Sequence, residues 1–420
     1  MDAQRRVMSL FSGGGGMDIG FDGGFECLKK SINTNIYPSW ISAENGSTVC
    51  VKRTGFKTVF ANDILQPAKS AWVSYFKNHI EDAEDIYRVE SIVDIVKRVK
   101  DGKEYFPKNI DVVIGGFPCQ DFSVSGKRKG FNSEKSHNGK KIAVGQPTEE
   151  NRGQLYMWMR EVISIVQPKV FVAENVKGLA SLEDAKEIVE HDFSNAADGG
   201  YIVVPAKVLN AADYGVPQAR ERIIFYGFKK NALKPQARDA LLNIAENPFY
   251  DPYPPATHSY SQTGENLCAF VTSADALAGL CEPEASDDAA QRKYSKAKYM
   301  AKGQGNTEVN LDSVAPTIRA EHHGNIEFRR LSAQNGGKHA EELVNGLPQR
   351  RLTVRECARI QTFPDDYQFV INTKNKDKSV SASAAYKLIG NAVPCVFAYN
   401  IAMRLSDMWD EYFISPDTRK

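Results

Sequence analysis

The chain has no cysteine pattern that would indicate a disulfide framework or a structural zinc site. Its seven cysteines, at positions 27, 50, 119, 268, 281, 357 and 395, are an odd number and show no Cys-x-x-Cys spacing. Scattered cysteines of this kind are usually small buried hydrophobic residues. The adjacent His322 and His323 have no further ligands at a suitable spacing, so we predict no metal site.

The sequence also lacks a long apolar run and an excess of charge of either sign. No segment approaches the roughly 20 apolar residues that span a bilayer, and residues 1–7 lead into a glycine-rich segment rather than the apolar core of a secretory signal. We therefore expect a cytoplasmic protein without membrane contact. Because the net charge is only +1, any basic footprint for nucleic acid has to be local. The clearest basic run is 127–141, and its composition alone favours a solvated loop.

Four apolar runs in the first part of the chain predict strands of a mostly parallel sheet. Residues 7–11, 58–61, 110–114 and 170–173 are each followed by glycine or polar residues. In such α/β sheets ligands bind at the carboxyl ends of the strands. Another strand candidate, 223–228, is followed by a proline- and glycine-rich region, so we predict a second, smaller domain there. The predicted order is a first part of the α/β domain at 1–228, the smaller domain at 229–349, a hinge region at 350–380 and a closing part of the α/β domain at 381–420.

The segment 11–21, Phe-Ser-Gly-Gly-Gly-Gly-Met-Asp-Ile-Gly-Phe, follows the first predicted strand and opens a predicted helix. Glycines let a backbone approach a nucleotide-like ligand closely, and a helix N-terminus offers free amides. A tight turn without a ligand explains the same residues, and the spacing is not Gly-x-Gly-x-x-Gly. Asp63, at the end of the next strand, could bind a ribose or cap the following helix.

Cys119 stands out among the cysteines because of its context. It follows the strand 110–114 on a turn made by Gly115, Gly116 and Pro118, so its sulfur is expected at the carboxyl edge of the sheet. Nearby amides or cations at such a position lower a thiol pKa and supply a thiolate nucleophile near neutral pH. A cysteine without such a context would more often be inert and buried.

Five further blocks resemble the ordered motifs of the DNA cytosine C5 methyltransferases, and segment 11–21 is similar to the first motif of that family. The blocks are Gly-Phe-Pro-Cys-Gln at 116–120, Glu-Asn-Val at 174–176, Gln-Ala-Arg-Glu-Arg at 218–222, Arg-Glu-Cys-Ala-Arg-Ile-Gln at 355–361 and Gly-Asn-Ala-Val-Pro at 390–394. The resemblance covers 7–228 and about 350–405. It implies a Rossmann-like, doubly wound α/β methyltransferase domain with an inserted target-recognition domain.

The resemblance also implies the catalytic residues. Cytosine C5 is a poor nucleophile, and addition of the Cys119 thiolate to C6 would convert the ring to an enamine. Glu174 would hydrogen-bond or protonate N3, which requires a site that favours the neutral carboxyl. Asn175 would orient that carboxyl or the loop. Arg220 and Arg222 would contact the cytosine O2 and help to fix Cys119, although surface ion pairs, for example with Glu221, are an alternative.

The implied methyl donor is S-adenosyl-L-methionine. The predicted donor-binding residues share positions at strand ends and helix starts: Phe11, Gly13, Gly15, Asp63, Ile64, Pro118, Leu155, Asn391 and Ala392. Core or capping roles remain open for Ile64 and Leu155. Near Glu90 and Ser91 the sequence departs from the family, which usually has an aspartate that reads the adenine amino group. We therefore assign that contact to neither residue.

The implied partner is double-stranded DNA, bound by a protein that we expect to be a monomer. Because a stacked base cannot present C6 to a thiolate, the cytosine must flip out. Segment 123–152 resembles the loop that closes on such a base. Given this resemblance, we expect its basic run to contact DNA phosphates rather than to be a solvated loop. Arg319 and Asn325 are of types that read guanine and adenine edges. The predicted DNA-binding residues are Gln120, Ser123, Ser125, Lys127, Arg128, Lys129, Arg319 and Asn325.

Three alternatives account for less of the sequence. The tRNA-cytosine branch of the same family usually carries Cys-Phe-Thr, which is absent here, and has a shorter recognition segment. A non-catalytic binding module gives no reason for Cys119, Glu174, Arg220 and Arg222 to occur together. A nicotinamide-dependent oxidoreductase rests on the glycine-rich turn alone. For a compact chain we expect a role in bacterial restriction-modification.

Overall fold

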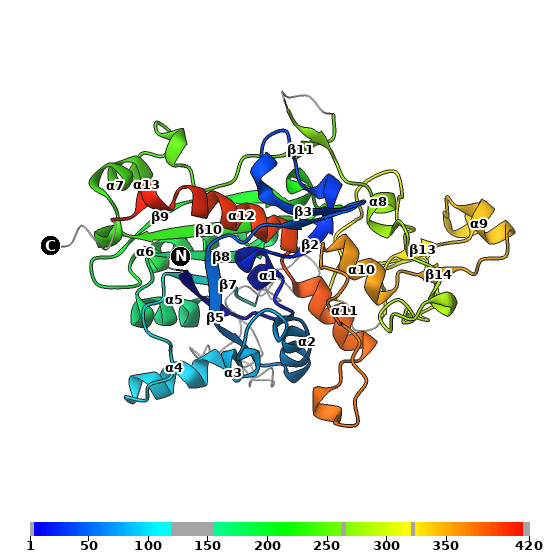
Figure 1. Ribbon diagram of the computed structural model, residues 1–420, viewed down its shortest axis with the longest axis horizontal. Coiled ribbons are helices and arrows are strands. Elements are labelled where there is room, and N and C mark those ends of the chain that lie inside the picture. Colours follow the sequence, from blue (N-terminus) through cyan, green and yellow to red (C-terminus); the bar gives the residue numbers. More distant parts are fainter. Residues whose placement is uncertain (1–3, 119–154, 183, 262–265, 321–323, 415–420) are drawn as a thin grey trace.

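The computed structural model describes residues 4–118, 155–182, 184–261, 266–320 and 324–414. A seven-stranded sheet with the order β6-β5-β1-β7-β8-β10-β9 lies at its centre (Figure 1). The strands are β1 (Arg5–Leu10), β5 (Phe56–Asp63), β6 (Tyr87–Val89), β7 (Val112–Gly116), β8 (Val170–Val176), β9 (Tyr201–Asn210) and β10 (Glu221–Lys229). The first five in the sheet order are parallel, whereas β10 is antiparallel to both β8 and β9. The predicted Rossmann-like α/β class is confirmed.

The order of the strands places a ligand site between β1 and β7. The chain moves outward from β1 through β5 to β6 and then returns to β7 on the other side of β1. Loops leave the carboxyl ends of β1 and β7 in opposite directions at such a switch point, which opens a crevice there. The sheet order therefore determines where the glycine-rich turn and the strand that precedes Cys119 come together.

Helices cover both faces of the sheet, so β1 is buried on both sides. Val7 belongs to the core that also contains residues of α1 (Gly16–Asp22), α2 (Gln66–Phe76) and α12 (Cys395–Asp407). Met8 points to the opposite core, with α4 (Ile92–Lys100), α5 (Leu155–Val166) and α6 (Ala185–Ser194). This alternation follows from the two-residue period of a strand. The helix α12 begins after Pro394, as the sequence pattern predicts, and lies against α1 because Gly20 admits Ala398 without a clash.

Contrary to the expectation from the sequence, the stretch Ala382–Asp407, which includes α11 (Ala382–Asn391) and α12, is long and apolar enough to cross a membrane by length and composition. Its most apolar window is 89% buried inside the protein. The apolar surface of this stretch is therefore already covered by the catalytic core.

The region between β10 and α10 (Val354–Ile360) divides into two parts. Residues near α7 (Pro235–Leu242) stay against the sheet, where Tyr253 donates a hydrogen bond to the carbonyl of Ile224 at 2.8 Å. The later residues form a lobe to the right of the sheet in Figure 1, here called the outer lobe (described residues of 273–351). It contains α8 (Ser273–Leu277), β13 (Phe328–Arg330), α9 (Ala340–Val344) and β14 (Arg350–Arg351). The boundary at 229 stays a prediction, and the contact of Tyr253 favours a later one.

Several elements were not predicted from the sequence. The edge strand β9 contains Pro205, which argues against a strand except at an edge or an irregularity. It lies at the sheet edge, and the β9–β10 register shifts beside this proline. The other missed strands include the three-residue β6, the short strands β11 (His258–Ser259), β12 (Cys268–Ala269), β13 and β14, and a small antiparallel sheet of β2 (Glu26–Leu28), β4 (Thr48–Val51) and β3 (Ile41–Asn45). Short strands carry too few residues for a clear period.

Candidate active site

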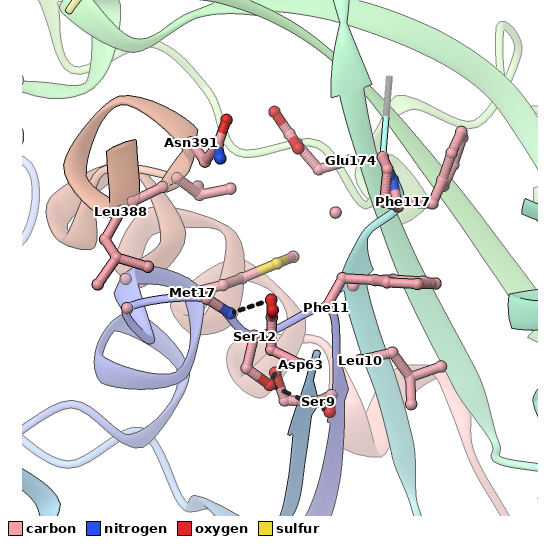
Figure 2. Close-up of a pocket in the computed structure, with 18 of the residues that line it drawn as sticks. Ser9, Leu10, Phe11, Ser12, Met17, Asp63, Phe117, Glu174, Leu388 and Asn391 are labelled. Atoms are coloured by element: carbon pink, nitrogen blue, oxygen red, sulfur yellow. Dashed lines mark hydrogen bonds between the residues drawn. The ribbon is translucent and has the colours of Figure 1, made fainter. Parts of the chain in front are cut away.

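A cavity of about 230 Å³ opens at the carboxyl ends of β1, β5, β7 and β8. Figure 2 shows Asn391 and Leu388 from α11 on one side of it and Glu174 from β8 on the other. Most predicted site residues in the described part of the chain line this cavity: Phe11, Gly13, Asp63, Ile64, Pro118, Leu155, Glu174, Asn175, Arg220, Arg222, Asn391 and Ala392. The fold therefore brings together residues that are up to about 380 positions apart in the sequence.

The glycine-rich turn is fixed by groups that lie far away in the sequence. The hydroxyl of Tyr87 donates to the carbonyl of Gly13 at 3.0 Å, and that of Tyr367 donates to the carbonyl of Gly14 at 2.6 Å. Burial raises the pKa of both tyrosines, so both hydroxyls remain donors. Phe11 has a φ of +54°, which a non-glycine residue adopts only when its surroundings enforce it. The turn is thus held in one shape at the edge of the cavity.

Gly15 requires a correction to the predicted donor site. It does not line the cavity; instead, a Cβ at this position would lie 2.5 Å from Cδ1 of Trp72. Its φ of +76° also favours glycine. Trp72 in turn donates from Nε1 to Oδ2 of Asp18 at 2.7 Å. The glycine therefore allows α1 and α2 to pack closely rather than admitting a ligand.

Asp63 binds two backbone amides near the start of α2, and the ribose contact that the sequence left open stays a prediction. Its Oδ1 accepts a hydrogen bond from the Leu65 amide at 3.0 Å, just before α2 begins. Its Oδ2 accepts from the Gly13 amide at 3.1 Å, which ties the ends of β1 and β5 together (Figure 2). Burial raises the pKa of Asp63, although these backbone hydrogen bonds oppose the shift. The carboxylate lines the cavity beside Ile64, whose side chain is 44% exposed.

The two residues at which the sequence departs from the family lie in different places. Glu90 faces away from the cavity, where it forms an ion pair with Arg98 and accepts a hydrogen bond from Tyr105 at 2.6 Å. Ser91 lines the cavity and caps α4 by accepting a hydrogen bond from the Val93 amide. Sequence reasoning could not choose between the two residues because it did not place the start of α4.

Glu174 and Arg222 form a buried ion pair at the end of the cavity nearest Pro118. Nε of Arg222 lies 2.7 Å from Oε1 of Glu174, and the two side chains are 11% and 9% exposed. Burial raises the pKa of Glu174, and the charges of Arg222 and Arg220 oppose that shift. Gly116 leaves room for the carboxyl group, since a Cβ there would lie 2.8 Å from its Oε2.

Asn175 connects β8 to the turn that leads to Cys119. Its Nδ2 donates to the carbonyl of Phe117 at 3.2 Å, so it orients the loop, one of the two predicted uses. Pro118 is the last described residue before Cys119, and it lines the cavity. Seven predicted site residues lie outside the described residues: Cys119, Gln120, Ser123, Ser125, Lys127, Arg128 and Lys129.

Arg220 is held inside the protein rather than at its surface. Its guanidinium donates to the carbonyls of Ile318, Gly390 and Ala392 at 3.0, 2.9 and 2.8 Å. The surface ion pair considered for it is therefore wrong, because the side chain is only 1% exposed. A cation surrounded by carbonyls holds the outer lobe against the start of the segment 390–394.

Two glutamines that sequence reasoning did not select extend this contact. Gln218 accepts from the Ile318 amide at 2.9 Å and donates to Oε1 of Gln361 at 3.1 Å. Gln361 donates to the carbonyl of Ile389 at 2.8 Å. Both belong to motif blocks already noted in the sequence, which is the signal that could have found them. We call Gln218, Arg220 and Gln361 the polar clamp.

Arg319 and Asn325 lie together at the edge of the outer lobe. The Arg319 guanidinium donates to Oε1 of Gln304 at 2.6 Å and to the carbonyl of Asn325 at 3.0 Å. It also lies 3.2 Å from Oε1 of Glu327. Base reading by these two residues stays a prediction, and the contacts show that the Arg319 side chain has a defined position without DNA.

Residues 41–407 match the family model of the C-5 cytosine-specific DNA methylases. The chain belongs to this family. This DNA (cytosine-5-)-methyltransferase uses S-adenosyl-L-methionine as its methyl donor.

It is 30% identical to the type II methyltransferase M.BsuRI of Bacillus subtilis, over 99% of this chain and 82% of that protein. It is 29% identical to M.FnuDI of Fusobacterium nucleatum, over 96% and 94%. A putative DNA modification methyltransferase from an Escherichia coli prophage has a similar fold, with a TM-score of 0.54, 20% identity and coverage of 97% and 99%.

Proposed function

We propose that the cavity methylates C5 of a cytosine flipped out of a specific duplex sequence, with Cys119 as the nucleophile and Glu174 as the acid. The observation that carries this proposal is the buried Glu174–Arg222 pair, 2.7 Å apart, in the cavity lined by Pro118. A carboxyl group whose pKa is raised by burial can donate a proton at a higher pH than an ordinary glutamate. Cys119 directly follows Pro118 in the sequence, and Pro118 lines this cavity.

The described cavity residues fit S-adenosylmethionine, which supplies an electrophilic methyl group when bound. The Asp63 carboxylate offers acceptors for ribose hydroxyls, and the exposed side chain of Ile64 offers an apolar surface for adenine. Ser91 lines the same cavity and is our candidate for the adenine amino group. Phe11, Pro118, Leu155, Asn391 and Ala392 would complete the walls.

The chain's own residues would then activate the base. Addition of the Cys119 sulfur to C6, together with transfer of a proton from Glu174 to N3, converts the ring to an enamine with a nucleophilic C5. After C5 is methylated, loss of the C5 proton to a base, departure of the sulfur from C6 as thiolate and return of the N3 proton to Glu174 give neutral 5-methylcytosine. Arg222 orients Glu174 and is the better candidate for the cytosine O2, because both terminal nitrogens of Arg220, Nη1 and Nη2, already donate to carbonyls.

The remaining calls concern the DNA and the cell. We place the closing loop on residues 123–152 and base reading on the outer lobe, with Arg319 and Asn325 as candidates. The relatives M.BsuRI and M.FnuDI are named type II methyltransferases, which supports a restriction-modification role that protects host DNA. We further propose a cytoplasmic monomer without a bound metal or membrane contact.

Replacement of the nucleophile tests this mechanism directly. We expect Cys119→Ser to abolish transfer of tritiated methyl groups to unmethylated plasmid DNA while leaving S-adenosylmethionine binding intact. Cys281→Ser, which changes an exposed cysteine, should keep wild-type turnover and serves as the matched control. Full turnover by Cys119→Ser would overturn the mechanism. Greater transfer to tRNA than to duplex DNA by the wild-type enzyme would overturn the substrate, and bisulfite sequencing of the methylated DNA would give the target sequence.

A further inference from the structure

A stretch of the outer lobe concentrates positive charge on a protein whose net charge is only +1. Between Asp288 and Glu308 the sequence has five basic residues and no acidic one. The five share an exposed position in the structure: Arg292, Lys293, Lys296, Lys298 and Lys302. We call residues 292–302 the basic strip. Sequence reasoning passed over this strip in favour of the basic run at 127–141.

The cations of the basic strip have no acidic partner among the described residues of the protein. Some other exposed lysines in the described chain do have one, such as Lys29 with Glu44 and Lys177 with Glu221. Lys296 instead lies 3.5 Å from the centre of the Tyr294 ring. Cations that are not neutralised within a protein raise the local potential and attract polyanions.

The backbone beneath the strip is held firmly, which separates it from an ordinary solvated loop. Arg351, which is 1% exposed, donates to the carbonyls of Ala297 and Lys298 at 2.8 and 3.0 Å. The Val354 amide donates to the carbonyl of Lys293 at 3.0 Å. The side chains of the strip thus extend into solvent from a backbone that is fixed on its inner side.

The strip adjoins the candidate base-reading residues. Arg319 contacts Gln304 at 2.6 Å, two residues beyond the strip, and a Cβ on Gly324 would collide with Ser295 within it. On its other side the backbone of Arg319 packs against Gly390, whose neighbour Asn391 lines the cavity. A continuous set of contacts therefore runs from the methyl-transfer cavity through Arg319 to the basic strip.

We propose that the basic strip binds the phosphate backbone of the substrate duplex beside the target base pair and contributes affinity without reading sequence. The proposal rests on the proposed function for its duplex substrate. Phosphate contacts position a protein on DNA, whereas base contacts specify the sequence. Each neutralised phosphate releases counterions, so the logarithm of the binding constant falls with the logarithm of salt concentration by about 0.9 per contact.

The test compares two triple variants of the full chain that remove the same charge. The strip variant is Lys293→Ala with Lys296→Ala and Lys298→Ala. The control variant changes three exposed lysines next to α4 and α7, which lie on the other side of the sheet from the outer lobe in Figure 1: Lys103→Ala, Lys230→Ala and Lys234→Ala. Fluorescence anisotropy measures binding of a labelled 30-base-pair duplex of mixed sequence from roughly 50 to 300 mM salt, the range over which phosphate contacts change affinity strongly.

We expect the strip variant to bind the duplex at least about tenfold more weakly at low salt and to lose roughly 2 to 3 units of salt slope. The control variant should retain the wild-type affinity and slope. Binding of S-adenosylmethionine by both variants checks that they are folded. Equal losses in the two variants, or no loss in the strip variant, would overturn the proposal.

A second arm separates duplex DNA from RNA and keeps the proposal independent of the reaction. If the strip variant loses affinity for a single-stranded RNA of equal length more than for the duplex, RNA is the partner and the proposal is wrong. Methyl transfer by the wild-type enzyme is measured in parallel. Its absence would overturn the proposed function, whereas the binding comparison would still decide the role of the strip.

Discussion

Glu174 in the catalytic cavity and Glu282 in the outer lobe each lie beside two arginines, yet their pKa values shift in opposite directions. Burial raises the pKa of Glu174 despite the charges of Arg222 and Arg220. Burial acts in the same direction on Glu282, but hydrogen bonds from Arg330 and Arg350 outweigh it and lower the pKa to about 2. The Glu174 side chain is 9% exposed and that of Glu282 is 32% exposed.

The number of neighbouring cations therefore does not by itself determine the charge state of a carboxyl group. Glu282 accepts hydrogen bonds from Arg330 at both oxygens, at 2.9 and 2.5 Å, and keeps part of its hydration. The free energy lost when a carboxyl group is fully removed from water exceeds the free energy gained from its attraction to a neighbouring arginine. Asp18 is a buried carboxyl group without an arginine partner among the described residues. Burial raises its pKa to about 7, although the hydrogen bonds from Ser9 and Trp72 oppose this shift. Burial thus raises the pKa of Glu174 and Asp18 in the catalytic part, whereas hydrogen bonds from two arginines lower that of Glu282 in the outer lobe.

The largest effect is expected from Glu174→Gln, which we predict to lower the rate of methyl transfer by about 10²- to 10⁴-fold, as for loss of a general acid. In the wild-type enzyme the rate should fall as pH rises through the Glu174 pKa, because the deprotonated group cannot supply a proton. The raised pKa places this decline at a higher pH than an ordinary glutamate would. The decline should be absent in Glu174→Gln, whose amide does not titrate.

Glu221→Gln is the matched control, because Glu221 is an exposed neighbour that pairs with Lys177. Its pH profile should follow that of the wild-type enzyme. An unchanged decline at high pH in Glu174→Gln would assign the proton donor to another group. The comparison of Glu174 with Glu282 would then say nothing about catalysis.

Asp18→Asn should have a smaller effect, which appears in stability rather than in chemistry. The raised pKa means that the folded protein holds a proton on Asp18 between about pH 4 and 7 while the unfolded chain does not. The contribution of Asp18 to the free energy of unfolding is therefore lost as pH rises through this range, by on the order of a few kcal/mol. An asparagine does not titrate, and it can accept from Trp72 through its oxygen while donating to the Ser9 hydroxyl through its amide nitrogen.

Urea unfolding at several pH values would measure the difference between wild type and Asp18→Asn. This difference should change between pH 4 and 7, whereas that of Asp198→Asn, at an exposed position, should stay constant. A constant difference for Asp18→Asn would mean that Asp18 is charged in the fold.

The smallest effect is expected from Glu282→Gln. Because the folded pKa is depressed, the contribution of Glu282 is present above its unfolded pKa of about 4.5 and is lost as pH falls towards 2. The partly exposed pair is screened by solvent, so we expect a loss of on the order of 1 kcal/mol at neutral pH. Thermal unfolding would measure it, and the methyl-transfer rate at saturating DNA should not change. A loss of activity matching that of Glu174→Gln would end the distinction between the two sites.

Much of the catalytic fold could be predicted from the sequence because its signals are local. The apolar runs that became β1, β5, β7 and β8 each end in glycine or polar residues, which is the pattern of buried parallel strands, and the run at 223–228 became the antiparallel strand β10. The edge strand β9 could not be predicted, since Pro205 conflicts with a strand unless the sheet edge is known. The outer lobe has short elements whose order depends on buried arginines rather than on a hydrophobic period.

The candidate site divides in the same way. Glu174, Asn175 and Asp63 belong to blocks whose spacing is readable along the chain, and they line one cavity. Gly15 was misassigned because a glycine that admits a ligand and one that admits Trp72 look alike in sequence. Gln218 and Gln361 were missed because their partners lie about 100 and 28 residues away.

By itself, the sequence determined the chemistry: a cysteine after Gly-Phe-Pro, a Glu-Asn-Val block and a glycine-rich turn, each defined by neighbours within a few residues. The tertiary structure decided the rest. It chose Ser91 over Glu90 for the cavity, made Arg220 a buried link to the outer lobe and raised the pKa of Glu174. These outcomes depend on burial and on long-range contacts, which arise only when distant segments exclude water from the same place.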